Sequence, residues 1–358
     1  MAARSRHWFF VIPALALTVS ALLPSVQARG KAIAVLVEAV GGSFPRPLAP
    51  SVERKDATLD GVTGHLYVPD HPAPPVLLLP GAATRGKDDP RAVRLARSLA
   101  RAERLVFVPD LTLASRRFDP QDFDRIVRAI VALSEHPSGT GPVVVLGISY
   151  GGSFALVAAA DPRVAGHLQR VAVFGAYFDL VGVIQAVTTG VSLVGGTRVP
   201  WEGHPLAGAL LQEAAISLIP EDARPPLRAV LEGRAEAASL PPEARGLHDL
   251  LTNRDPAATF ELAERLPDRT REFLTGFSPS SVAGDIRVPV VAMHSSDDPA
   301  VPYGEAIRLA RAMPTARLVT VRTFRHVDLE AGPGGVRSLL GDLWDAWTFT
   351  SWVLEPQE

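Results

Sequence analysis

The sequence predicts an α/β protein with a mostly parallel, doubly wound sheet and an inserted helical cap. Short, continuous apolar runs alternate with helix-length stretches through most of the chain. Strands that are apolar throughout are typical of a parallel sheet that helices cover on both faces. Residues 180–285 interrupt this alternation, since they are rich in Ala, Leu, Pro and Glu and contain no convincing strand. We therefore expect a mostly helical cap at about 180–285.

The composition excludes several classes of protein. The chain has 358 residues, 47% apolar and 21% charged, which is ordinary for a globular protein. Its 38 acidic and 36 basic residues give a formal net charge of −2, so we expect no nucleic-acid partner. Cysteine is absent, which excludes disulfides, thiolate-bound zinc, iron–sulfur clusters and a thiol nucleophile.

The first 28 residues have the layout of an export signal. Arg4 and Arg6 precede an apolar run of 16 residues, Trp8–Leu23, and Val26-Gln27-Ala28 offers small residues for a signal peptidase. The run is short for a bilayer span of about 20 residues. An uncleaved membrane anchor and a buried core helix stay open as alternatives. We expect an exported protein, periplasmic or extracellular, or one associated with the membrane through this segment.

The elements after this segment follow in order. Residues 29–50 are expected to be a linker that contains a short helix at Lys31–Val40 and three prolines in Gly41–Pro50. The main domain, residues 51–358, begins with two strand-like patches, Val52–Leu59 and Val62–Val68. The dipeptide Asp60-Gly61 between them is a strong hairpin signal.

The remaining strands and helices are predicted from their hydrophobic patterns. The buried strands are expected at Val76–Leu79, Leu105–Val108, Val143–Leu146, Val171–Phe174, Val288–Met293 and Arg317–Val321. The main helices are expected at Asp89–Glu103, Gln121–Ser134, Ser153–Ala160 and Tyr303–Met313. Arginines 91, 94, 97, 101 and 104 form a basic stripe, which could contact anionic lipid or an acidic substrate. We favour a solvated helix face that is partly paired with Asp88 and Asp89.

A candidate nucleophile lies between a predicted strand and a predicted helix. Gly147-Ile148-Ser149-Tyr150-Gly151 matches the pattern G-x-S-x-G, directly after the apolar run Val143–Leu146. A serine on such a tight strand-to-helix turn has strained backbone angles, and its hydroxyl stands above the sheet. The helix N-terminus behind it favours developing negative charge. A glycine-rich connection with an incidental serine is the alternative.

With these residues the chain resembles the α/β-hydrolase family, more specifically its serine esterase, lipase and dienelactone-hydrolase-like branches. The resemblance covers roughly residues 60–358 and implies an α/β-hydrolase type of sheet. It also implies a triad in the order Ser, acid, His, with the acid after a late strand and the histidine near the C-terminus.

The acid and the base can each be sought in the sequence. His294-Ser295-Ser296-Asp297-Asp298-Pro299-Ala300-Val301-Pro302 is similar to the family's H-G-x-x-D-x-x-V-P segment, with Ser295 in place of glycine. The match assigns the acid to Asp298, while Asp297 and Asp179 stay open as rivals. His326 follows the last strand and lies 28 residues after Asp298, so we expect it to be the general base.

The oxyanion hole is expected to use two backbone N–H groups. One is that of Tyr150, directly after the nucleophile. The other is that of Ala82 in Pro80-Gly81-Ala82-Ala83, where the family commonly has His-Gly. Pro80 departs from that pattern, but the hole uses main chain, so Ala82 can still serve. A simple Pro-Gly turn is the alternative.

These residues together predict a serine hydrolase that cleaves carboxylic esters through an acyl-enzyme on Ser149, with no cofactor and no metal. The expected partner is a small-molecule ester substrate. A serine peptidase, an acyltransferase with the same triad, and a catalytically inactive hydrolase-fold binding protein remain alternatives.

Overall fold

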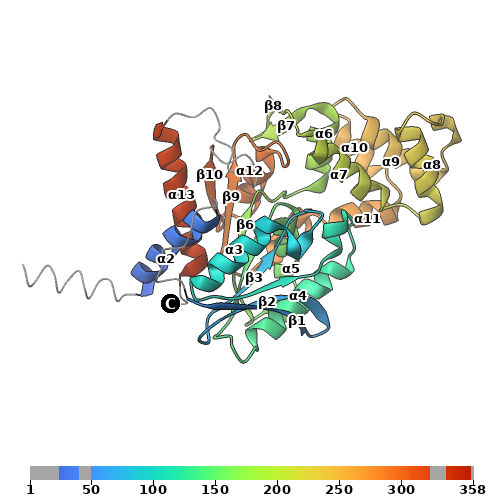
Figure 1. The fold of residues 1–358 in the computed structure, drawn as a ribbon. Coiled ribbons are helices and arrows are strands. Elements are labelled where there is room, and N and C mark those ends of the chain that lie inside the picture. The colour runs from blue at the N-terminus through green and yellow to red at the C-terminus, as the bar shows by residue number, and fades with distance from the viewer. Residues whose placement is uncertain (1–23, 40–49, 323–335, 356–358) are drawn as a thin grey trace, which may run out of the picture.

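The computed structural model describes residues 24–39, 50–322 and 336–355. Its centre is an eight-stranded sheet in the order β1-β2-β4-β3-β5-β6-β9-β10 (Figure 1). The strands from β4 to β10 are parallel, and only β1 and β2 run antiparallel to their neighbours. The predicted α/β fold with a mostly parallel sheet is therefore confirmed.

The strand bounds follow the apolar runs closely. The antiparallel edge consists of β1 (Val52–Leu59) and β2 (Val62–Pro69), and the turn residues Asp60 and Gly61 between them both have positive φ. The parallel strands are β3 (Pro75–Leu79), β4 (Leu105–Pro109), β5 (Val143–Ile148), β6 (Leu168–Phe174), β9 (Val290–Ser295) and β10 (Arg317–Val321). The first three of these are buried along almost their whole length, as expected for strands covered on both faces.

Helices cover the two faces of the sheet. On one face, α2 (Pro24–Ala39), α3 (Pro90–Arg101) and α13 (Val336–Leu354) pack over residues such as Val106 and Leu146. On the other face lie α4 (Gln121–Ser134), α5 (Tyr150–Ala159) and α12 (Tyr303–Ala312). This arrangement is the doubly wound layering that the alternation of strands and helices indicates.

The segment expected to be a linker is structured over its first half. Helix α2 is longer than the helix expected at Lys31–Val40, and it buries Ala28, Ala32 and Val35 against the sheet and α13. Residues 29–39 are thus a packed helix and no linker. The helix also runs through Val26-Gln27-Ala28, where we expected a cleavage site. The apolar run Trp8–Leu23 lies outside the described residues.

Helix α3 carries the basic stripe, and its arginines differ in their surroundings. Arg91 pairs with Asp89, the residue that caps the helix, at 3.0 Å. Arg101 pairs with Glu38 and so joins α3 to α2. Arg104 lies beyond the helix and donates to the backbone carbonyl of Leu354, and burial lowers its pKa to about 10. The stripe is therefore only partly a solvated face.

The cap is mostly helical and contains one hairpin that we did not expect. Its helices are α6 (Leu180–Thr189), α7 (Pro205–Ile216), α8 (Arg224–Leu231), α9 (Pro242–Thr252), α10 (Thr259–Glu264) and α11 (Asp268–Gly276). The expectation of no strand was wrong, because β7 (Val191–Val194) pairs with β8 (Thr197–Pro200). Gly195 and Gly196 both have positive φ at the turn, which suits a two-residue hairpin.

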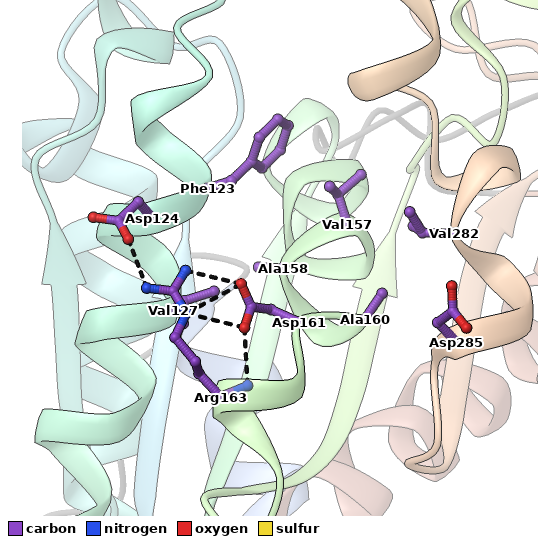
Figure 2. Close-up of a pocket in the computed structure, with 10 residues that line it drawn as sticks. All are labelled: Phe123, Asp124, Val127, Val157, Ala158, Ala160, Asp161, Arg163, Val282 and Asp285. Carbon is purple, nitrogen blue, oxygen red and sulfur yellow. Dashed lines mark hydrogen bonds and ion pairs between the residues drawn. The ribbon is translucent and has the colours of Figure 1, made fainter.

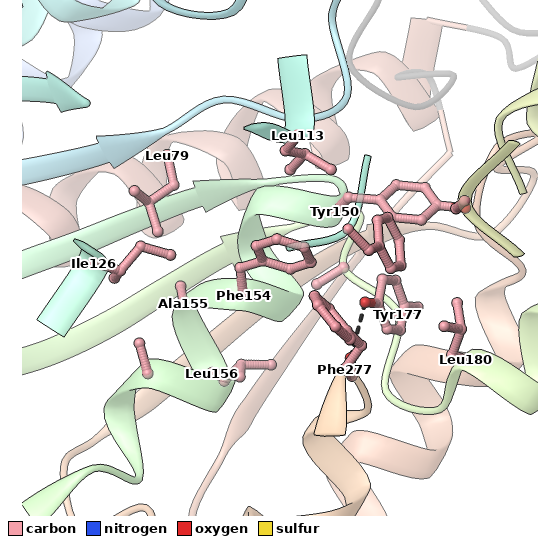
Figure 3. Close-up of a cluster of buried hydrophobic side chains, with 14 of the residues drawn as sticks. Leu79, Leu113, Ile126, Tyr150, Phe154, Ala155, Leu156, Tyr177, Leu180 and Phe277 are labelled. Atoms are coloured by element: carbon pink, nitrogen blue, oxygen red, sulfur yellow. Dashed lines mark hydrogen bonds between the residues drawn. The ribbon is translucent and has the colours of Figure 1, made fainter. Parts of the chain in front are cut away.

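A group of aromatic side chains fixes the end of the cap to the main domain (Figure 3). The ring of Phe277, just after α11, stacks on Phe118 at 5.0 Å and lies 5.4 Å from Phe154 on α5. The hydroxyl of Tyr177 donates to the carbonyl of Phe277 at 2.9 Å. Rings of this size bury large apolar areas, so the cap is held close to the helix that begins beside Ser149.

Among the described residues, no helix is both long and apolar enough to cross a lipid bilayer.

A buried carboxylate links the cap to the main domain a second time. Glu305 on α12 is buried, and its Oε2 accepts the N–H groups of Phe178 at 3.1 Å and Asp179 at 2.6 Å. Arg308 lies 3.6 Å from Oε1. Burial raises the pKa of Glu305 to about 7, and the negative charge of Asp179 adds to that rise while Arg308 opposes it.

This raised pKa gives a pH dependence of stability. The folded protein holds the proton of Glu305 more tightly than the unfolded chain does, and this difference stabilises the fold. The stabilisation is full below about pH 4.5 and is lost as the pH rises towards about 7. We expect the free energy of unfolding of the wild type, measured in urea, to fall by up to about 3 kcal/mol more than that of Glu305→Gln between pH 4.5 and pH 8. Parallel pH profiles of the two proteins would contradict this assignment.

Candidate active site

Ser149 lies alone between a strand and a helix in a strained conformation. Strand β5 ends at Ile148 and α5 begins at Tyr150, while Ser149 has φ 54° and ψ −130°. L-residues with a side chain rarely adopt such angles, so the surrounding contacts must hold them. The N–H of Ser149 donates to Phe174 O at 2.7 Å, and its carbonyl accepts from Gly152 N at 2.8 Å.

The flanking glycines are required by close backbone approach. A Cβ at Gly147 would overlap the Cα of Gly152, and one at Gly151 would overlap the carbonyl oxygens of Leu79 and Pro80. No side chain fits at either position without moving the main chain. The structure thus supplies the atoms that require glycine at both glycine positions of the G-x-S-x-G pattern.

The turn after β3 lies directly against the serine. A Cβ at Gly81 would be 2.9 Å from Ser149 Cβ and 3.5 Å from Ser149 Oγ. Ala83 N donates to Gly81 O at 2.7 Å, which makes the turn tight around Ala82. The N–H of Tyr150 belongs to the first turn of α5, where backbone donors have no partner within the helix. Ala82 and Tyr150 thus lie on the two chain segments that border Ser149.

The surroundings of the Tyr150 side chain could not be predicted from the sequence. Its ring packs against Tyr177 at 5.1 Å (Figure 3). It also packs against Phe118 at 5.8 Å. The phenol oxygen is buried and has no hydrogen-bond partner among the residues that the structure describes. Burial raises the pKa of Tyr150 well above its usual value, and the charge of Asp298 raises it further, so the hydroxyl stays protonated.

Asp298 is the most enclosed of the three candidate acids. It is 1% exposed, and its Oδ1 accepts the N–H groups of Ala300 at 2.8 Å and Val301 at 2.9 Å. The Nε2 of His294 lies 3.6 Å from Oδ2 and 3.0 Å from Val301 O. From the cap, the indole of Trp201 donates to the carbonyl of Asp298 at 2.9 Å. The carboxylate therefore has a fixed position.

The two rival acids occupy turn and cap positions. Asp297 is exposed, and its Oδ1 lies 3.4 Å from the hydroxyl of Ser296. Asp179 is the N-cap of α6, where its Oδ1 accepts from Val181 N at 2.9 Å. Its Oδ2 lies 4.0 Å from Arg308. Asp179 thus serves the N-terminus of α6 and pairs with Arg308, while Asp297 lies exposed in a turn, and aspartate is common in both positions.

The sheet brings the candidate residues to one edge. Leu79 of β3 pairs with Gly147 of β5, Ile148 with Phe174 of β6, and Phe174 with Met293 of β9. These strands are parallel, so Ala82, Ser149, Tyr150 and Asp298 all follow the carboxyl ends of neighbouring strands. His326 lies outside the described residues. The last strand before it, β10, ends at Val321 beside Ser295, at this same edge.

A small cavity of about 90 Å³ adjoins the turn that carries Gly81. It is lined by Pro80, Gly81, Thr84, Arg85, Gly86, Lys87, Pro109, Asp110, Leu111, Leu113 and Ala114. Within it, Lys87 Nζ lies 2.8 Å from Asp110 Oδ1, which raises the pKa of Lys87. Among the described residues, no three His, Cys, Asp or Glu side chains are placed to hold a metal ion.

A larger cavity of about 230 Å³ lies at the opposite end of α5 (Figure 2). Arg163 there bridges Asp161 and Asp124, each at 2.8 Å. The hydrogen bonds to Arg163 lower the pKa of both carboxylates. The cavity contains an ion-pair network and no candidate nucleophile. Helix α5, which has 10 residues, separates this cavity from Ser149. The larger volume of the cavity therefore does not make it the active site.

Comparison with known proteins agrees with the fold. Residues 76–332 match the model of the alpha/beta hydrolase family, which covers most of the chain. The protein therefore belongs to the alpha/beta hydrolase family, as the resemblance in its motifs implied. No curated protein matches the chain.

Several solved structures are similar in fold at low sequence identity. Alpha/beta hydrolase GrgF from Penicillium sp. sh18 has 16% identity and a TM-score of 0.49, over 84% of this chain and 99% of that one. Dienelactone hydrolase from Anabaena variabilis has 16% identity and a TM-score of 0.44, over 84% and 97%. Acylaminoacyl peptidase from Pyrococcus horikoshii has 10% identity and a TM-score of 0.48, over 87% and 41%. These likenesses carry no inference about the reaction.

The difference between Asp298 and Asp297 can be tested through stability. Asp298→Ala leaves the half-buried N–H of Ala300 and the buried N–H of Val301 without their acceptor, and the buried donor alone costs about 1–3 kcal/mol. Asp297→Ala should change the free energy of unfolding by only about 0.5 kcal/mol, because its side chain is exposed. Equal decreases in the free energy of unfolding of the two variants, measured in denaturant, would show that Asp298 does not organise this turn.

Proposed function

We propose that the protein is a serine hydrolase that cleaves carboxylic esters, with Ser149 as the nucleophile. The observation that carries the proposal is the position of Ser149, alone between β5 and α5 at positive φ, with the Gly81 turn against it. A strained serine at the carboxyl edge of a parallel sheet is costly to maintain. Such strain is typical of functional sites.

The proposed reaction has two stages. Ser149 Oγ attacks the acyl carbon while His326 accepts its proton, and His326 then returns a proton to the leaving alcohol. Water, activated by His326, cleaves the acyl-enzyme in the second stage and releases the acid. The chain has no cysteine, so a thiol cannot take the place of Ser149.

The backbone N–H groups of Ala82 and Tyr150 would stabilise the tetrahedral oxyanion. Two observations support them: Gly81 closely approaches Ser149, and Tyr150 opens α5 with an N–H that lies in the unpaired first turn. The positive end of the α5 dipole adds to the same effect, because it lies where the negative charge develops. Pro80 has no backbone N–H to donate, but the proposed oxyanion hole does not use that position.

Asp298 is the proposed acid that orients His326 and stabilises its imidazolium form. Two amides hold one oxygen of its carboxylate, and the residue is 1% exposed, so the carboxylate is fixed and shielded from water. Asp297 is exposed and Asp179 caps α6, which makes each less suited to this role.

The nucleophile is tested by hydrolysis of p-nitrophenyl esters of graded acyl length. Ser149→Ala should lower kcat by roughly 10⁴-fold or more, as loss of a triad nucleophile does. Ser153→Ala is the matched control, because it removes a buried hydroxyl one turn along α5 that donates only to Tyr177 O. That variant should keep its activity. Residual hydrolysis by Ser149→Ala within tenfold of the wild type would exclude the proposal.

The acid is tested with three isosteric variants in the same assay. Asp298→Asn should lower kcat by roughly 10²- to 10⁴-fold, since the amide cannot stabilise an imidazolium. Asp297→Asn and Asp179→Asn should stay within a few-fold of the wild type, because asparagine also serves in turns and at N-caps. A larger loss of kcat in Asp179→Asn than in Asp298→Asn would assign the triad acid to Asp179, which follows β6.

A further inference from the structure

Exposed apolar side chains gather on one part of the surface. Among the described residues, seven large apolar side chains are exposed, and six of them lie on α2 or α13. They are Val26, Ile33 and Val37 on α2, and Leu340, Leu343 and Trp344 on α13. Single exposed apolar residues are ordinary on soluble proteins, but a contiguous group marks an interaction site. The two helices lie together at the left of Figure 1, away from the cap.

Helix α2 is apolar on both of its sides. Ala28, Ala32 and Val35 form the side that is buried against α13 and the sheet. On the outward side, Val26, Ile33 and Val37 are spaced by 7 and 4 residues, so they lie on one stripe of the helix. Ile33 is 56% exposed. An ordinary surface helix would place polar residues on this stripe.

Helix α13 continues the stripe with aromatic residues. Leu340 is 62% exposed and Trp344 is 64% exposed, and both lie on the helix face that also carries Leu343. The rings of Trp344 and Trp347 are in contact, with centroids 4.6 Å apart. The indole N–H of Trp347 donates to the carbonyl of Arg29 at 2.9 Å, which joins the α13 stripe to the outward side of α2.

The acidic residues of α13 do not interrupt this surface. Asp342 is buried and accepts from the N–H of Arg322, next to β10. Asp345 is half-buried and follows Asp342 by three residues, so it lies on the same side of the helix as Asp342. Both carboxylates therefore face away from the stripe formed by Leu340, Leu343 and Trp344.

We propose that this surface of α2 and α13, the α2–α13 face, docks on a lipid bilayer. The sequence supplies the reason to choose lipid over a second copy of the chain: the apolar run Trp8–Leu23 ends at the residue before α2 begins. An apolar segment and an outward apolar stripe thus follow each other on one stretch of chain. Tryptophan prefers the membrane–water interface, where its ring is in an apolar layer and its N–H finds a polar partner.

The burial of Ala28 supports continuity between the apolar run and the domain. Cleavage after Ala28 would divide α2 within a turn that packs against α13. In the proposed arrangement the run stays attached, and the helix that follows it lies at the bilayer surface with its outward stripe in the headgroup region. This proposal does not depend on the hydrolase reaction, because its test measures lipid contact and not turnover.

The test uses single-cysteine variants of the full chain, which has no cysteine of its own. A polarity-sensitive dye is attached at Leu340→Cys on α13, or at the matched control Val199→Cys on β8 of the cap, the seventh exposed apolar position. Each protein is mixed with vesicles of phosphatidylcholine and phosphatidylglycerol, with and without brominated acyl chains. Both native side chains are exposed, so the substitutions remove little packing, and thermal unfolding of each labelled protein verifies its fold.

We expect the dye at position 340 to shift to the blue with vesicles and to be quenched several-fold more by the brominated lipid than the dye at position 199. Equal responses at the two positions would overturn the proposal, even if the chain is bound to the vesicles through its N-terminus. A blue shift at position 340 without lipid, together with twice the monomer mass in sedimentation, would also overturn it and would assign the α2–α13 face to a second copy.

Discussion

The close approach of three backbone segments around Ser149 is the constraint on which the candidate site depends. The carbonyls of Leu79 and Pro80 leave no room for a Cβ at Gly151, and Gly152 leaves none at Gly147. Only with both glycines can β5 turn directly into α5 and place Ser149 at φ 54°. The same approach brings the turn after β3 against the serine, so the proposed nucleophile and the proposed oxyanion donors are fixed by one set of contacts.

The rest of the fold keeps this arrangement rigid. The strands that end at the site are buried on both faces, and α5 packs through Phe154 into the aromatic group that includes Phe277. The cap is tied back by Glu305, which accepts two N–H groups at the start of α6, and by Trp201, which donates to the carbonyl of Asp298. A turn that stores backbone strain needs such support, because the strain is offset by packing elsewhere.

Much of this could be predicted from the sequence, and the failures have physical causes. Continuous apolar runs predicted the parallel strands to within a few residues, and G-x-S-x-G predicted the turn at Ser149. Helix α2 begins earlier than the helix expected at Lys31–Val40, because its outward side is also apolar and obscures the helical period of its first turns. The hairpin β7–β8 was missed since its strands are only four residues long and β8 is exposed. Burial at Asp298 and exposure at Asp297 depend on how the turn folds. The motif match therefore favoured Asp298, but the sequence left the adjacent Asp297 open as a rival.

Covalent labelling of the full-length protein with a fluorophosphonate tests most directly whether Ser149 is an activated nucleophile. Mass spectrometry of the intact chain and of its peptides then locates the adduct. A serine that is activated at a strained turn should react with this electrophile, whereas ordinary surface serines should not. We expect one adduct per chain, on Ser149, and none in Ser149→Ala. An adduct on another serine, or no adduct under conditions that label a known serine esterase, would contradict it.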